Sequence, residues 1–212
     1  MKFFKIIAVF SSLLVASFSH AKDVRGFYVG AGVGTIGVDD QDGFFDVFED
    51  LPFDVAGEGN TYKLIAGYQV NHILALEAQY TKYGDVKIAS KPVTVQSWEP
   101  EALSFTANAG YTFNNGLRPF GILGLSMLEL NESSNVDFLK LDEDKYLGLR
   151  YGLGIEYMPP AFNALSVRLA YEADFFYAEK KETRHGAYSD YTITELYDFT
   201  LDSVYLSVSY RF

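Results

Sequence analysis

The chain has 212 residues, of which 49% are hydrophobic and 17% aromatic, and its formal net charge is -11. This length permits one domain, and the acidic balance argues against nucleic acid as a partner, because phosphates require basic surfaces. With no cysteine in the sequence, a disulfide framework and a thiol-linked lipid anchor are excluded.

The first 21 residues have the features of a secretory signal. Lys2 and Lys5 precede an apolar run over residues 6–18, and Ser19, His20 and Ala21 supply a small-residue cleavage pattern. The alternative is an N-terminal membrane anchor, but a spanning helix needs about 20 apolar residues, which this run lacks. We therefore expect cleavage after Ala21 and a mature domain over residues 22–212.

Eight segments of the mature chain alternate with a period of two, which predicts β-strands with two unlike faces. The fourth shows this clearly, since its apolar face includes Phe105 and Tyr111 while its other face is small and polar. The fifth is apolar on both faces, and its orientation stays open. The segments cover about residues 26–36, 61–70, 74–81, 103–113, 117–130, 147–157, 165–174 and 204–212.

The connections between these segments alternate in length. Short links follow the second, fourth and sixth segments, and one contains the turn dipeptide Asn115-Gly116. The long polar links cover about residues 38–60, 84–101, 131–145 and 178–200. Short turns on one side, long loops on the other and an even strand number are typical of transmembrane barrels. We therefore predict an all-β fold, an eight-stranded antiparallel up-and-down transmembrane β-barrel.

A soluble eight-stranded ligand barrel is the main alternative. It would expose the polar face of each strand to water, where about a quarter to a third of residues are usually charged. The polar face of the fourth segment has no charge, and those of the first and sixth are rich in glycine. Such faces suit a crowded interior, and aromatic residues near the strand ends would form the girdles of a membrane barrel.

The membrane orientation places a balanced set of charges inside the barrel. A buried charge is tolerated only when it is paired and hydrogen-bonded, and eight strands leave room for side chains alone. We therefore expect negligible open-channel conductance. The expected interior charge network comprises Lys63, Arg150, Arg168 and Arg211 against Glu77, Glu156, Glu172 and Asp174.

Three stretches carry a family resemblance: Gly26-Phe27-Tyr28-Val29-Gly30-Ala31-Gly32, Gly67-Tyr68-Gln69-Val70-Asn71 with the following Leu76-Glu77-Ala78, and the closing Tyr210-Arg211-Phe212. They resemble the first, second-hairpin and last strands of the small outer membrane barrels of the OmpA and OmpX type. The resemblance implies a monomer in the outer membrane of a Gram-negative cell, surrounded by lipid and lipopolysaccharide. It also implies that the barrel-assembly machinery recognises Tyr210 and Phe212 as an assembly signal. Unlike OmpA, the sequence shows no Pro-rich hinge or periplasmic domain, so a cell-wall tether is not expected.

The link over residues 38–60 is strongly acidic. Asp40, Asp42 and Glu49 fall at three ligand positions of an EF-hand-like loop, but Val38 occupies its first position and no flanking helices are indicated. A solvated acidic loop is the better interpretation, so no metal or cofactor is expected. Phe44, Phe45, Phe48 and Phe53 in this link would either cover the barrel mouth or contact a host or matrix surface ligand.

Three classes of function remain at the level of the sequence. A structural or surface-interaction barrel, such as an adhesion or colonisation factor, is the first, and OmpW-like passage of small or hydrophobic solutes is the second. A barrel enzyme acting on lipid is the third, but the only candidate catalytic group is His185, near Ser189 and Asp190. Its surroundings match no barrel-enzyme motif, so we do not expect an enzyme.

Overall fold

The computed structural model describes residues 25–40, 53–90, 93–134, 145–160, 162, 164–185 and 190–212. The expected signal segment, residues 1–21, lies outside them, so its cleavage stays a prediction. None of the described residues forms a helix long and apolar enough to cross a membrane.

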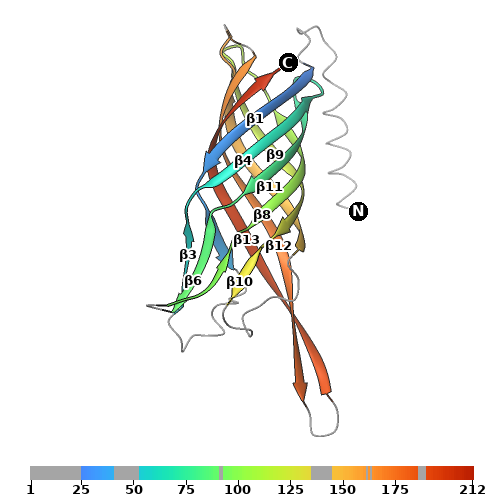
Figure 1. Cartoon of the computed structure of the whole chain (residues 1–212). Coiled ribbons are helices and arrows are strands. Elements are labelled where there is room, and N and C mark those ends of the chain that lie inside the picture. The colour runs from blue at the N-terminus through green and yellow to red at the C-terminus, as the bar shows by residue number, and fades with distance from the viewer. Residues whose placement is uncertain are drawn as a thin grey trace, which may run out of the picture.

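Eight strands form a closed antiparallel barrel (Figure 1). Each neighbours the next barrel strand in the chain, and the last pairs with the first over Tyr28 to Gly34 and Tyr205 to Arg211. The predicted eight-stranded fold is therefore confirmed. The barrel strands are β1 (Gly26–Gly34), β4 (Thr61–Gln69), β5 (Leu74–Lys82), β8 (Glu101–Gly110), β9 (Leu117–Glu129), β11 (Lys145–Tyr157), β12 (Leu165–His185) and β13 (Asp190–Arg211).

The register determines the width of the barrel. A path along directly paired residues starts at Val29 in β1 and returns to the first part of the chain at Asp39 in β2 (Gly37–Asp40), ten residues further on. A shear of ten over eight strands corresponds to a strand tilt of about 40° and an interior that side chains can fill. The path passes through Ala66, Ala78, Phe105, Leu125, Leu149, Phe175 and Thr200.

The two faces of the wall are opposite in character. The outward side chains are large and apolar, and Phe27 and Leu153 keep 68% and 67% of their surface exposed. Most inward side chains are small, polar or charged, and Arg150 and Glu172 are fully buried. Phe120, Ile122 and Tyr205 belong to a smaller apolar cluster inside the barrel. This inside-out distribution is expected of a barrel whose outer face meets lipid and whose interior holds paired charges.

The short connections gather at one end of the barrel together with the C-terminus, and we call this the short-turn end (Figure 1). The opposite end, the loop end, contains β-structure where the sequence predicted polar loops. A second sheet has the order β10-β7-β6-β3. Its strands are β3 (Phe53–Glu58), β6 (Asp85–Ser90), β7 (Val93–Trp98) and β10 (Glu132–Ser134).

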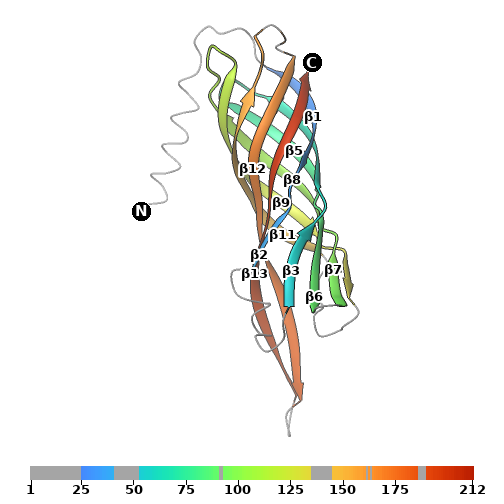
Figure 2. The ribbon, with the colours of Figure 1, turned by 90° about the vertical axis from the view of Figure 1, so that its left-hand side faces the viewer.

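The last two strands also extend far beyond the wall. The ladder of β12 with β11 ends at Phe176, and that of β13 with β2 ends at Phe199. Beyond these points β12 and β13 pair with each other as far as His185 and Asp190. Figure 2 shows this hairpin projecting past the barrel. The prediction of a loop over residues 178–200 was therefore wrong, because hairpin pairing continues through polar sequence.

Candidate functional site

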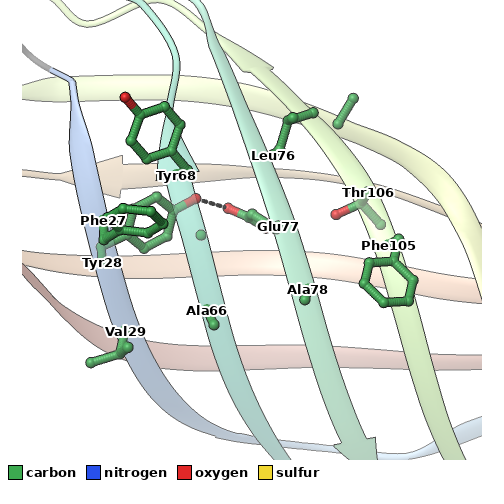
Figure 3. Close-up of a pocket in the computed structure, with 12 residues that line it drawn as sticks. Phe27, Tyr28, Val29, Ala66, Tyr68, Leu76, Glu77, Ala78, Phe105 and Thr106 are labelled. Carbon is green, nitrogen blue, oxygen red and sulfur yellow. Dashed lines mark hydrogen bonds between the residues drawn. The ribbon is translucent and has the colours of Figure 1, made fainter.

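The barrel interior contains two hydrogen-bonded groups of charges. The first centres on Glu77 of β5, whose Oε1 accepts hydrogen bonds from the Tyr28 hydroxyl at 2.6 Å, Asn108 Nδ2 at 2.8 Å and Arg168 Nη2 at 2.8 Å. The Tyr28 ring lies over Gly67, where an added Cβ would overlap it. Glycine at this position therefore lets Tyr28 reach across β4 to the carboxylate (Figure 3).

Arg118 and Glu156 complete this first group towards the short-turn end. They are direct neighbours across β9 and β11, and Arg118 Nη1 lies 3.3 Å from Glu156 Oε2. Arg118 Nη2 also donates to the Ile73 carbonyl in the short turn at 3.2 Å. Glu156 Oε1 accepts from Ser166 at 2.8 Å and lies 3.8 Å from Arg168 Nη2.

The second group surrounds Arg150 of β11. Its Nε donates to Asp174 Oδ1 at 2.8 Å, and its Nη1 donates to Thr81 and Ser104. Asp174 also accepts a hydrogen bond from the Tyr83 hydroxyl at 2.7 Å. Because Arg150 and Asp174 are paired directly across β11 and β12, the register of the two strands places this ion pair.

Lys63 and Glu172 form the remaining buried ion pair. Lys63 Nζ lies 2.5 Å from Glu172 Oε2 and 4.4 Å from the centre of the Tyr205 ring. The Tyr205 hydroxyl donates to the other oxygen of Glu172. Arg150 Nη1 is 4.0 Å from Glu172, so this pair belongs to the second group.

Gln79 joins the two groups. Its Nε2 donates to Glu77 Oε2 at 2.9 Å, and its Oε1 accepts from Arg150 Nη1 at 3.1 Å. Hydrogen bonds, with one ion-pair contact of 3.8 Å between Arg168 and Glu156, therefore run from the Ile73 carbonyl in the short turn to Tyr83, just beyond β5 at the loop end. Such a network stabilises only when its members are satisfied, so each link supports the next.

The structure brings together seven of the eight expected network residues. Arg211 is not among them, because it lies at the short-turn end and forms no ion pair among the described residues. Arg118 occupies the fourth basic position, which the sequence analysis missed because the fifth segment could not be oriented. Arg118 and Ser126 are an even number of residues apart, so they lie on the same face of the strand. This face should point inwards, because a basic side chain on the lipid face costs about 2–4 kcal/mol at midplane.

An apolar cluster lies above the charges at the loop end. It includes Trp98, Tyr146, Phe176 and Phe199, and the rings of Trp98 and Phe199 meet edge to face at 5.7 Å. We call this cluster the aromatic cap. Its buried members are Tyr83, Val86, Trp98, Ala102, Leu128, Leu130, Tyr146, Phe176, Ala178, Tyr197, Phe199 and Leu201. The inward faces thus carry the charges, with a smaller apolar cluster, within the barrel and are mainly apolar at the loop end.

A hollow of about 570 Å³ lies in the outer wall over β1, β4, β5 and β8 (Figure 3). Its lining includes the outward residues Phe27, Val29, Tyr68, Leu76 and Phe105, together with the alanines Ala66, Ala78 and Ala107. The hollow is almost wholly apolar.

The other expected site residues fall outside these features. Asp40 ends β2 opposite Phe199, whereas Asp42 and Glu49 lie outside the described residues. Among the residues that are described, no three acidic, histidine or cysteine side chains could hold a metal ion. His72 lies in the short turn, and His185 ends the ladder of β12 with β13, where only its backbone is described.

The expected assembly signal lies on the outer face at the short-turn end. Tyr210 and Phe212 are 47% and 75% exposed, and their rings meet edge to face at 5.2 Å. Their recognition by assembly machinery stays a prediction.

At the loop end, Glu58 accepts a hydrogen bond from the exposed Lys87 and raises the pKa of that ammonium group.

Comparison with known proteins supports the architecture. Residues 6–212 match the family model of the outer membrane protein beta-barrel domain. No curated protein matches the chain.

Three solved barrels are similar in fold. Neisserial surface protein A has 18% identity and a TM-score of 0.52, with 88% of this chain and 97% of that chain covered. The outer membrane protein OprG from Pseudomonas aeruginosa has 12% identity and a TM-score of 0.53, with 87% and 96% covered. The outer membrane protein AlkL, determined in lipid bilayers, has 16% identity and a TM-score of 0.52, with 92% and 93% covered.

Proposed function

Because the chain belongs to the outer membrane protein beta-barrel domain family, we propose that it is a closed barrel that displays β-structure at the cell surface for contact with another surface. Barrels of this kind have short periplasmic turns and longer extracellular loops. The short-turn end is therefore periplasmic, and the loop end faces the exterior.

The main support for a closed barrel is that two layers of side chains, one charged and one apolar, occupy its interior. Four basic and four acidic side chains occupy the middle of the barrel, namely Lys63, Arg118, Arg150, Arg168, Glu77, Glu156, Glu172 and Asp174. The aromatic cap lies above them at the loop end. A continuous row of water molecules through these layers would have to break ion pairs and hydrate an apolar cluster. Both changes are unfavourable.

The projecting structure supports a role in surface contact. The second sheet and the β12–β13 hairpin lie beyond the apolar belt, so they can reach past the lipid headgroups (Figure 2). The link over residues 38–60 has the exposed acidic residues Asp39 and Glu58 near its ends, while residues 41–52 lie outside the described part. An adhesion or colonisation role through these segments, with a host or matrix surface as partner, fits this arrangement, and no catalytic step is included.

Cell adhesion tests this function. Cells producing the full chain are compared with cells lacking it and with cells whose chain has residues 180–195 replaced by Asn-Gly, which keeps Glu179 paired with Leu196. Adhesion is measured on host cells and on extracellular matrix. We expect the full chain to increase adhesion and the shortened hairpin to lower it towards the level without the protein. Equal surface abundance and heat-modifiable mobility show that both barrels are assembled. Equal adhesion by all three strains would contradict the proposal.

OmpW-like passage of small or hydrophobic solutes is the second candidate. One observation favours it, because β2 and β3 belong to different sheets and share no ladder at the loop end among the described residues. A solute could enter laterally there, but it would then meet the aromatic cap. Uptake of a hydrophobic compound that depends on the chain and falls in a variant with β2 and β3 joined by a disulfide would support passage instead.

A further inference from the structure

The hollow in the outer wall is separate from the segments that we propose for surface contact. Two alanines from neighbouring strands, Ala66 of β4 and Ala78 of β5, are paired directly and form its floor. Val29 of β1 and Phe105 of β8 continue the same row on either side. The row therefore runs from large to small to large, which makes a depression in an otherwise bulky belt (Figure 3).

Aromatic side chains border the depression towards the short-turn end. Phe27 and Tyr68 are paired across β1 and β4, and their ring centres are 4.8 Å apart. The polar groups behind the wall are already engaged, since the Tyr28 hydroxyl donates to Glu77. The hollow thus presents packing surface and no free charge, which fits a hydrocarbon chain and not a headgroup.

The membrane surrounds this part of the wall. The lining residues lie within a few positions of the strand ends at the short-turn end, which is periplasmic in barrels of this family. Between lipid and protein there is no hydrophobic driving force, so dispersion contacts and packing decide which surface a chain prefers. A hollow of about 570 Å³ that stayed unfilled would lose these contacts on every side.

We propose that the hollow binds one acyl chain of a phospholipid in the periplasmic leaflet of the outer membrane. The hollow is continuous with the lipid-facing belt, and its floor of alanines lets the chain lie against the backbone of β4 and β5. The chain is held between Phe27 and Tyr68 at one end and Phe105 on the far side. We expect neither a lipid A acyl chain, which belongs to the other leaflet, nor a second copy of this chain to occupy the hollow.

Native mass spectrometry of the full refolded chain tests the site. The protein in detergent is mixed with phosphatidylethanolamine in one arm and lipid A in the other. The test variant is Ala78→Phe, which fills the floor. The control is Ala31→Phe, which adds the same ring to the outer face of β1 outside the hollow.

We expect the wild type and Ala31→Phe to retain one phosphatidylethanolamine and Ala78→Phe to lose it. Nuclear Overhauser contacts from acyl methylenes in nanodiscs should also be stronger to the methyls of Ala66 and Ala78 than to that of Ala31. This second measurement needs no variant, so it applies even if Ala78→Phe fails to fold. The proposal is overturned by the absence of a wild-type adduct, by equal loss in both variants, by preference for lipid A, or by a dimer in place of the adduct.

Discussion

Arg150 shows how single residues hold the barrel interior together. It hydrogen-bonds to five side chains from three strands and the residue after β5, and it is fully buried. A buried charge without its partner is far more costly than a buried pair is favourable. Arg150 therefore contributes chiefly by keeping Asp174 and Glu172 compensated.

Replacing Arg150 by methionine should destabilise the barrel strongly. The substitution leaves the Asp174 carboxylate buried without its bidentate partner, so we expect a loss of about 3–5 kcal/mol in the free energy of unfolding. Urea unfolding of the chain refolded in lipid vesicles measures this loss. Arg211→Met is the matched control, because Arg211 forms no ion pair among the described residues, and it should change stability by about 0.5 kcal/mol or less.

Replacing Gly67 by alanine should also destabilise the barrel. An added Cβ would overlap the Tyr28 ring and displace its hydroxyl from Glu77. Overpacking of this kind costs about 1–3 kcal/mol, so Gly67→Ala should lower the urea midpoint. Gly121→Ala is the control, since its Cβ would find its nearest neighbour at 3.7 Å. Equal midpoints for the two variants would show that Tyr28 does not need this glycine.

The strands differ in how far their sequence predicted them. β4 and β8 alternate cleanly, and their predicted ranges were close to the observed ones. β9 was not oriented, because Phe120 and Ile122 point inwards and make both faces apolar. Its arginine, Arg118, was missed for the same reason. The short strands of the second sheet were missed because pairing between distant segments, and not local alternation, defines them.

The projecting part of the β12–β13 hairpin should open more readily than the part within the barrel. Within the barrel each of its strands has two neighbours, whereas beyond Phe176 and Phe199 each has only the other. A two-stranded hairpin is marginally stable in water, so its amides should exchange through local opening. Hydrogen exchange should be much faster over residues 180–185 than over residues 166–174 of the same strand. Equal protection along β12 would indicate a partner on the projecting hairpin.

The whole molecule combines a polar interior with an apolar cover. Strand number, closure and the exterior belt were predicted from the alternation of the strands and from the lengths of the links. The aromatic cap was not predicted, because several of its members, among them Trp98 and Phe199, lie in segments that the sequence analysis assigned to long polar links. Its members come from five barrel strands and from the loop-end segments near Tyr83 and Trp98, so it depends on contacts between segments far apart in the sequence.

We predict that this barrel does not conduct solutes, and single-channel recording in planar bilayers measures this property. The full chain, refolded and checked by heat-modifiable mobility, is added to the bilayer at increasing voltage. We predict no stable openings, because ion pairs fill the interior and the aromatic cap covers it. Reproducible, long-lived openings of large conductance from the assembled barrel would show instead that solutes pass through its interior.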